Sequence, residues 1–400
     1  MTRFLRRGDA CLVGLLFAIG HAEAAPSSIP NVVYSFCAPG SLGCSLGDQA
    51  IGWLPASVAS GPDGAFYGIT LGNDRPDSSG SLFRVDLTDR TASALFQFPS
   101  AYIPSTWVKF DVDGSVWGGF RRDPTGIDTE GFYRISPAGE FTITRQRKYS
   151  GLACNKPIED RFGVLYGVAT DGYYGAIPNF AYAIFPNGAL KVLHRFEDGE
   201  RFDCPDFEPV LAVDGNLYGI IWNRRVSPVA SAVFRLGRDG TYVIAHAFDR
   251  DSDGSPITPL TVGSDGALYG VSELALTGAN DVHRLYRLSL DGQFTNLGTI
   301  SPDFFFRIQK LTLMPDGALY GTGKGSDSGT VDILFRFYPT GEYAQLYVDR
   351  RVGTGSLDTP LIRGADDALY GANTEGGRNL AGALFRYVPA ATPAVPKPAR

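Results

Sequence analysis

The sequence predicts an all-β protein, a seven-bladed β-propeller with four antiparallel strands in each blade. Three observations predict this fold. A short motif recurs seven times at a nearly constant spacing, each copy lies among β-type runs and tight turns, and the strand missing from the last copy is found near the start of the chain. A constant period indicates a supersecondary unit that buries its apolar face only against its neighbours.

The motif is an apolar residue, an aromatic residue and a glycine, preceded by one further residue. Its seven copies lie at residues 65–68, 115–118, 164–167, 216–219, 267–270, 318–321 and 368–371. The motif glycines are Gly68, Gly118, Gly167, Gly219, Gly270, Gly321 and Gly371, so the period is about fifty residues. We therefore expect seven structural repeats in one domain, over residues 31–389.

Each repeat contains the turns and strands of one blade. Five motifs follow an Asp-Gly pair, whereas the third and seventh copies have Phe162-Gly163 and Asp366-Asp367 instead. Asp-Gly between β-type runs predicts a tight hairpin with both turn residues at positive φ. A strand with an aromatic-Arg pair follows about fifteen residues later, then a second turn such as Asp239-Gly240 and a fourth strand such as residues 241–248. Four antiparallel strands make one propeller blade.

The two ends of the domain predict that the ring is closed. The last repeat ends after its third strand, residues 383–387. The segment Val32–Phe36 matches the fourth strands that end at Phe196 and Phe248. We expect this N-terminal strand to complete the seventh blade, which leaves no unpaired sheet edge at the seam. A linear solenoid is the alternative.

The termini outside the domain predict an exported protein. Residues 1–24 have a basic start with Arg6 and Arg7, an apolar core over residues 11–20 and small residues at Ala22 and Ala24, as a secretory signal peptide does. The location could then be secreted, periplasmic or at the cell surface. The apolar core of this segment is too short to span a bilayer. We expect no transmembrane span in the mature chain either. The Pro-rich residues 390–400 predict a disordered tail.

Four cysteines remain after signal removal, which favours disulfides in an oxidising compartment. The pairings we favour are Cys37 with Cys44, and Cys154 with Cys204, although three connectivities are open. The formal net charge of −6 without basic runs argues against a nucleic-acid partner. We expect a monomer.

The Asp-Gly-Ala-Leu-Tyr-Gly copies, with Glu375-Gly376-Gly377 and residues 382–386 in the last repeat, resemble the GloVer-type tandem repeat of bacterial exported proteins. The resemblance covers nearly the whole mature chain. It implies a surface or secreted repeat protein of a family with varied C-terminal anchors and no established activity.

Function is expected on one face of the propeller. Strand order places the uniform Asp-Gly turns on one face and long, dissimilar connections on the opposite face, where a rigid scaffold usually carries binding residues. We call the latter the variable face. Its non-repeated candidates for a glycan or protein ligand are Tyr173, Tyr174, Trp222, Arg224, Arg225, Phe304 and Phe305. The alternative is that these residues fill gaps between blades.

Calcium is a candidate ion at one turn on the variable face. Asp249, Asp251 and Asp253 alternate before Gly254, and hard oxygen ligands suit Ca²⁺. The twelfth position is Leu260 rather than the Glu of an EF-hand, so a solvated acidic turn is the other interpretation. We expect no other cofactor.

The sequence contains no recognisable catalytic constellation. His194 and His246 occupy matching places on outer strands, which indicates packing. The repeated arginines of the third strands indicate an architectural role; they are Arg84, Arg134, Arg235, Arg287, Arg336 and Arg386. Our hypothesis is a non-catalytic binding module. The rival is a lactonase-like hydrolase or lyase with a metal in the central channel, where the inner strands supply Lys109, Asp111, Glu208 and Arg363.

Overall fold

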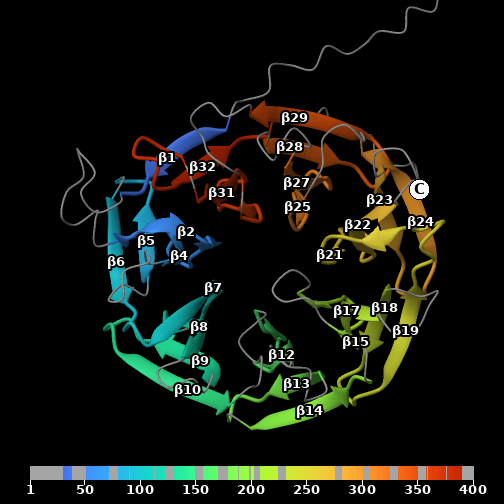
Figure 1. Cartoon of the computed structure of the whole chain (residues 1–400), viewed down its shortest axis with the longest axis horizontal. Coiled ribbons are helices and arrows are strands. Elements are labelled where there is room, and N and C mark those ends of the chain that lie inside the picture. The colour runs from blue at the N-terminus through green and yellow to red at the C-terminus, as the bar shows by residue number, and fades with distance from the viewer. Residues whose placement is uncertain are drawn as a thin grey trace, which may run out of the picture.

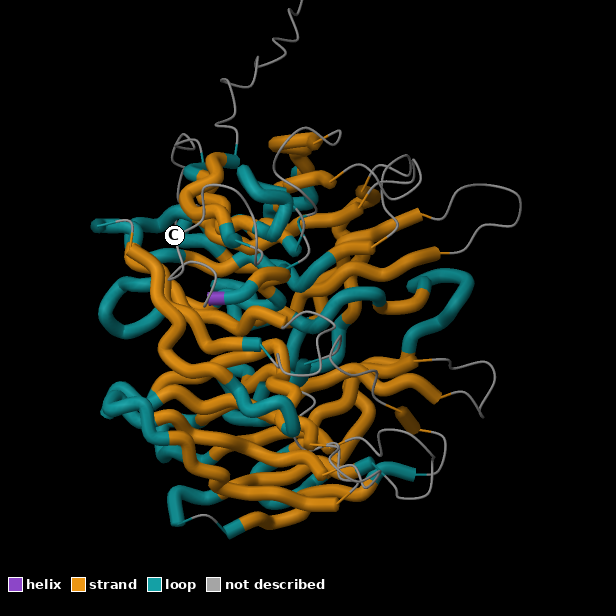
Figure 2. Tube along the Cα trace, turned by 60° about the vertical axis from the view of Figure 1, so that its left-hand side comes forward, coloured by secondary structure: helices purple, strands orange, loops and turns teal. Residues whose placement is uncertain are grey.

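The computed structural model shows seven small antiparallel sheets arranged in a ring (Figure 1), which confirms the propeller. The residues that the structure describes are 30–37, 51–71, 80–89, 91–111, 113–122, 129–148, 156–169, 179–187, 189–197, 200–201, 208–223, 231–274, 282–300, 307–324, 332–349, 357, 359–374 and 376–389. Within these ranges the chain is almost entirely strands and turns (Figure 2), and Ile51 alone has helical backbone. No helix in the described part is long and apolar enough to cross a membrane.

Each sheet is one blade, and in blades 1 to 6 the strands run from the ring centre outwards in chain order. Blade 1 contains β2 (Trp53–Pro55), β3 (Ala59–Ser60), β4 (Phe66–Leu71), β5 (Ser81–Asp86) and β6 (Thr91–Gln97). Blade 2 contains β7 (Tyr102–Phe110), β8 (Val116–Arg122), β9 (Thr129–Ile135) and β10 (Phe141–Lys148). Blade 3 contains β11 (Ile158–Glu159), β12 (Leu165–Ala169), β13 (Phe180–Ile184) and β14 (Leu190–Arg195).

The next three blades follow the same order. Blade 4 contains β15 (Glu200–Arg201), β16 (Val210–Leu211), β17 (Leu217–Asn223), β18 (Ser231–Leu236) and β19 (Tyr242–Ala247). Blade 5 contains β20 (Ser255–Pro256), β21 (Thr261–Val262), β22 (Leu268–Leu274), β23 (Val282–Leu288) and β24 (Phe294–Ile300). Blade 6 contains β25 (Arg307–Ile308), β26 (Thr312–Leu313), β27 (Leu319–Lys324), β28 (Asp332–Phe337) and β29 (Tyr343–Asp349).

The seventh blade is completed by the N-terminal strand, as the sequence predicts. Its strands are β30 (Ile362–Arg363), β31 (Leu369–Asn373), β32 (Ala383–Tyr387) and, on the outside, β1 (Asn31–Ser35). Strand β1 pairs antiparallel with β32, from Asn31 opposite Arg386 to Ser35 opposite Ala383. The adjoining Phe36 is fully buried, and its ring makes an edge contact with Phe83 of blade 1 at 5.0 Å. The seam is therefore held by a backbone ladder and by an aromatic contact to the next blade.

The apolar core lies between the blades. Seven clusters of buried side chains occur in the described residues, and each draws its members from two adjacent blades. One example packs Tyr269 and Leu285 of blade 5 against Leu319 and Phe335 of blade 6. This arrangement agrees with a unit that cannot bury its apolar face alone.

The motif glycine is required by an aromatic ring of the neighbouring strand. Gly219 of β17 lies opposite Phe234 of β18, and a Cβ at residue 219 would come within 2.5 Å of the Phe234 ring. The other motif glycines are overlain in the same way by Phe83, Tyr133, Tyr182, Tyr286, Phe335 and Phe385. Glycine therefore recurs in the motif because each blade packs an aromatic ring closely against this position.

The inner hairpin turns differ in detail from the prediction. In blade 1 the amide of Gly64 donates to the carbonyl of Gly61 at 3.1 Å, and the amide of Gly61 donates to the carbonyl of Ala65 at 2.7 Å. Gly64 has φ of +80°, whereas Asp63 is not among the residues with positive φ. The expectation of two positive φ values was wrong, since this pattern is a type I turn followed by a glycine bulge.

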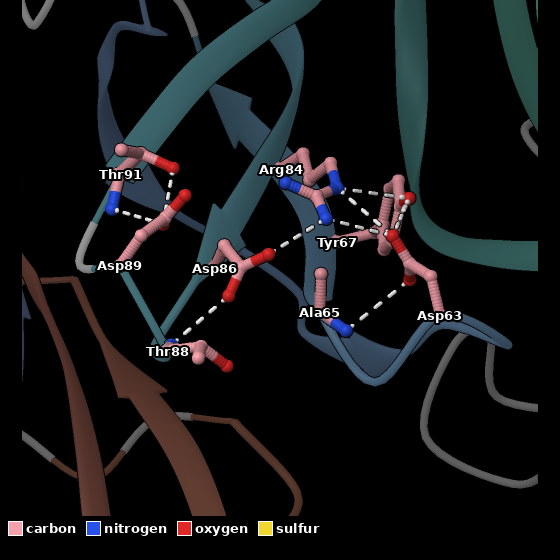
Figure 3. A network of polar contacts seen from close by, with 8 residues as sticks. All are labelled: Asp63, Ala65, Tyr67, Arg84, Asp86, Thr88, Asp89 and Thr91. Carbon is pink, nitrogen blue, oxygen red and sulfur yellow. Dashed lines mark hydrogen bonds and ion pairs between the residues drawn. The ribbon is translucent and has the colours of Figure 1, made fainter.

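The aspartate of this turn organises a polar network on the face of the inner turns (Figure 3). Asp63 caps its own turn by accepting from the amide of Ala65, and it also accepts from the hydroxyl of Tyr67 and from the guanidinium of Arg84. Blades 5 and 7 repeat these contacts with Asp265 and Asp366. The repeated arginines thus have the architectural role that the sequence indicates.

Blade 3 builds the network from different residues. Phe162 replaces the turn aspartate, and Ala183 stands where other blades have the arginine. Asp160 accepts from the Tyr166 hydroxyl at 3.3 Å, and Arg238 of blade 4 lies 3.1 Å from the same carboxylate oxygen. Because the Asp160 side chain is only 1% exposed, the arginine from the next blade neutralises a buried charge.

Candidate ligand site in the axial cavity

The innermost strand of blades 1, 2, 4, 5 and 6 is interrupted at one position of the repeat. In blades 1, 4, 5 and 6 the interruption splits the strand in two, and in blade 2 it is a bulge between Pro104 and Val108 of β7. Such a bulge redirects a side chain and leaves ladder groups unpaired. In blade 1 the hydroxyl of Ser57 accepts from the freed amide of Ile69 at 3.1 Å. The break is therefore a stable feature of the inner strand.

A ring of seven residues lies at this position of the repeat, eleven positions before each motif glycine. We call it the channel ring; its members are Ser57, Trp107, Lys156, Glu208, Pro259, Lys310 and Pro360. All seven line a cavity of about 650 Å³ at the centre of the propeller. This volume lies in the range of ligand pockets. The ring is thus the narrow part of an axial cavity to which every blade contributes.

The channel ring carries an ion pair between blades that are not neighbours. Lys310 Nζ of blade 6 lies 3.0 Å from Glu208 Oε2 of blade 4. Both side chains are about 30% exposed, so the pair is accessible from the cavity. The contact passes in front of blade 5, whose ring member is Pro259 and adds no charge.

Two further lysines enter the same part of the cavity. Lys109 of β7 pairs with Glu159 of β11 at 2.5 Å, and the side chain of Lys109 is 16% exposed. Lys156 is partly buried, and no carboxylate of the described residues forms an ion pair with it. Burial lowers the pKa of Lys156, and the charges of Lys310 and Lys109 lower it further, whereas Glu208 acts in the opposite direction. Positive charge therefore exceeds negative charge at the ring.

The cavity continues on both sides of the ring. On the side of the variable face its walls include Trp107, Trp222, Ile257 and Gln309. On the side of the inner turns a second hollow of about 430 Å³ shares Lys156, Glu208 and Lys310 with the first and adds Glu159 and Val262. The charged residues of the ring thus lie where the two hollows meet.

Of the predicted ligand residues, the structure describes Trp222, and it lines the axial cavity. The remaining six lie outside the described residues and stay predictions: Tyr173, Tyr174, Arg224, Arg225, Phe304 and Phe305. Among the inner-strand residues considered for a channel metal, Lys109 and Glu208 line the hollows described above. Asp111 accepts instead from the indole of Trp117 at 3.2 Å, and Arg363 pairs with Asp367 at the blade 7 turn.

The channel ring does not fit a divalent metal. Its one carboxylate, Glu208, is paired with Lys310, and the ammonium groups nearby would repel a cation. Within the described residues no three His, Cys, Asp or Glu side chains come together in a way that could hold a metal ion.

The acidic turn of blade 5 uses its carboxylates within the turn. Asp249 Oδ1 accepts from the amides of Asp251 and Ser252, both at 2.9 Å. Asp253 Oδ2 accepts from the amide of Asp249 and lies 3.1 Å from His246 Nε2. The calcium prediction for Asp249, Asp251 and Asp253 stays a prediction.

The histidines of the outer strands pack against aromatic rings of the next blade. His194 stacks on Tyr242 with ring centroids 4.0 Å apart, and His246 stacks on Phe294 at 4.4 Å. Cys37 is buried beside the seam and is disulfide-bonded. Its predicted partner Cys44 lies outside the described residues, as do Cys154 and Cys204.

A larger hollow of about 1480 Å³ lies at the seam rather than on the axis. Its walls are strand β1 and the turns of blades 1 and 7, and they include Asp366, Tyr370 and Arg386 of the repeated polar network. Because its polar groups already serve blade architecture, we place the candidate site at the axial cavity, where charges that do not repeat gather.

Fold and cavity together define a β-propeller of seven blades with a ligand-sized axial cavity. Residues 205–395 match the Gloeobacter/Verrucomicrobia repeat, so this part of the chain carries repeats of this family, which confirms the resemblance for the last four motif copies. No curated protein matches the sequence.

Solved structures show the same fold. An oligogalacturonate lyase from Vibrio parahaemolyticus has a TM-score of 0.55 and 11% identity, over 81% of this chain and 86% of that one. A 6-phosphogluconolactonase homologue from Bacteroides fragilis, itself named only by similarity, has a TM-score of 0.49 and 16% identity, over 78% and 88%. At such identities the likeness concerns the fold alone.

Sequence reasoning identified Lys109 and Glu208 but missed Lys156 and Lys310. The inner strand at these positions is only two residues long in blades 3 and 6, so no strand pattern marks them. Both lysines lie eleven positions before a motif glycine, where blades 5 and 7 have proline. A charged residue at this position departs from the repeat, and this departure is the signal that could have identified them.

Proposed function

We propose that this chain is an exported, non-catalytic binding protein that takes a glycan or protein ligand at the variable face, with part of the ligand in the axial cavity. One observation carries the proposal. The residues that repeat from blade to blade build the blades, whereas the residues that do not repeat gather at the channel ring and at Trp222. Pockets with mainly apolar walls and a few placed polar groups are typical ligand sites.

The test is a glycan array and a pull-down screen with the wild-type protein and a variant whose cavity is blocked. Thr106 is exposed in the bulge of β7 and lines the cavity, so Thr106→Trp fills space without a change to a paired residue. The matched control is Leu95→Trp, since Leu95 is 40% exposed on the outer strand β6.

We expect a ligand that binds the wild type and the Leu95→Trp variant and that binds Thr106→Trp at least about tenfold more weakly. Equal binding by both variants would place the ligand elsewhere on the molecule. Screens without any ligand, together with robust turnover of a substrate by the purified protein, would overturn the proposal in favour of an enzyme.

A further inference from the structure

The charges at the channel ring are unbalanced. The charges of Lys109, Lys310 and Glu208 all act on Lys156. Lys310 pairs with Glu208, and Lys109 pairs with Glu159. Like charges repel strongly where the surroundings are partly buried, because the effective dielectric constant there is lower than in water. A negatively charged group that enters the cavity would relieve this repulsion.

Lys156 is the ammonium group best placed to receive such a group. Lys310 is paired with Glu208 and Lys109 with Glu159, whereas Lys156 has no ion pair with a described carboxylate. Its lowered pKa has burial as its first cause, so its surroundings disfavour an uncompensated positive charge. An ammonium donates up to three hydrogen bonds from a compact charge, which suits an anionic oxygen group.

The cavity that Lys156 lines also has apolar walls on the side of the variable face. Trp107 and Trp222 line the same cavity, together with Pro256, Ile257 and Ile308. Indole rings combine a large apolar surface with a polar edge, and such surfaces pack against rings that carry hydroxyl groups at their rims. Trp107 is buried and Trp222 is partly exposed, so a lysine and the Trp222 ring in one cavity match a sugar ring with an acidic substituent.

We propose that the axial cavity binds an acidic saccharide, whose anionic group is held by Lys156 and whose sugar ring packs against Trp222. This inference rests on the proposed binding function and names its ligand class. The carboxylate of Glu208 forms an ion pair with Lys310, so Lys310 has a partner when no ligand is bound. A carboxylate and a sulfate ester share the required chemistry, and the experiment distinguishes them.

The experiment measures binding by calorimetry to three probes: an oligogalacturonate, a sulfated galactan oligomer and a neutral galactan oligomer of equal length. We expect at least one acidic probe to bind the wild type about tenfold more tightly than the neutral probe. Lys156→Met should remove this preference, and Lys156→Arg should keep part of it. Lys191→Met, which changes an exposed lysine of the outer strand β14, should leave binding unchanged.

Glu208→Gln gives a second readout with the opposite sign. Removal of this carboxylate frees Lys310 and raises the positive charge, so binding of the acidic probe should become several-fold tighter. A structural role of Lys156 and Glu208 would weaken binding in both variants. Preference for the oligogalacturonate or for the sulfated oligomer identifies the anion, and either supports the proposal.

Suppose that the neutral and acidic probes bind equally, and that Lys156→Met leaves this binding unchanged whereas Thr106→Trp abolishes it. This result would overturn the proposal of an acidic ligand and would still support the proposed binding function. Absence of binding by all three probes, with a protein ligand found in the pull-down, would likewise overturn the acidic saccharide alone. Absence of any ligand in every screen would count against the proposed function itself.

Discussion

Arg84 donates from Nε and from Nη2 to the same carboxylate oxygen of Asp63, at 3.0 and 2.9 Å. Asp63 lies in the inner turn of blade 1 and Arg84 lies on β5, so the pairing ties the third strand of the blade to this turn. Burial alone would raise the pKa of Asp63, but hydrogen bonds from Arg84, Tyr67 and the Ala65 amide outweigh it, so the pKa lies below its ordinary value. The same balance lowers the pKa of Asp265 and of Asp366.

These lowered pKa values predict that acid destabilises the propeller. A carboxyl group with a lower pKa in the folded state stabilises the fold above its unfolded pKa and loses that contribution as the pH falls through the folded value. We expect the free energy of unfolding to be nearly constant between about pH 7 and 5 and to fall below about pH 4. Denaturant titrations at each pH measure it. Asp63→Asn should reduce the slope, and an unchanged slope would contradict this role.

The pair of Asp160 and Arg238 predicts that blade 3 depends on blade 4. Arg238→Met leaves the buried Asp160 charge without its arginine, so we expect a loss of about 1.5–3 kcal/mol in unfolding free energy. Chemical denaturation measures this loss. Arg250→Met is the control, since Arg250 is exposed on the blade 5 turn. Equal stabilities for the two variants would show that the interblade pair contributes nothing.

The contact between Gly219 and Phe234 predicts that a single methyl group disturbs a blade. Gly219→Ala places a Cβ against the Phe234 ring, and we expect a destabilisation of about 1–3 kcal/mol. The double variant Gly219→Ala/Phe234→Leu should show a favourable coupling energy, because the smaller side chain gives the Cβ room. Additive effects of the two substitutions would rule out the packing explanation.

The seam predicts a strong effect of truncation at the first strand. Deletion of residues 30–36 removes β1 and the fully buried Phe36, so we expect the melting temperature to fall by at least about 5 °C. Deletion of residues 390–400, the predicted tail, is the control and should leave the melting temperature unchanged. A truncated protein that melts like the intact chain would contradict closure by β1.

The sequence predicted the architecture because its signals repeat. The motif glycines count the blades, and Val32–Phe36 matches the fourth strands well enough to identify the seam. Turn geometry was predicted less well, since a type I turn with a glycine bulge and the expected turn share the Asp-Gly pair. The conformation of Asp367 was not predicted either. It has φ of +57° at the turn position where other blades have glycine, and the Asp366-Asp367 pair does not indicate a positive φ.

The candidate site could be predicted only in part, for a physical reason. Lys310 lies where the inner strand of blade 6 is broken and Lys156 lies just before the two-residue strand β11, and neither alternation nor a turn signal marks such positions. Their partners come from other blades, as Glu208 does for Lys310, so the spacing along the chain carries no direct information about the contact. The ion pair between Asp160 of blade 3 and Arg238 of blade 4 could not be predicted, for the same reason.

The pairing of Asn31 with Arg386 also sets the order in which the molecule can be completed. Blades 1 to 6 consist of strands that are close together in the chain, so their hairpins can form during translation. The seventh blade joins the earliest strand to the latest one, and such a distant contact is slow to form. In a circular permutant whose chain starts within another blade, that blade would contain both chain ends and would be the last to form.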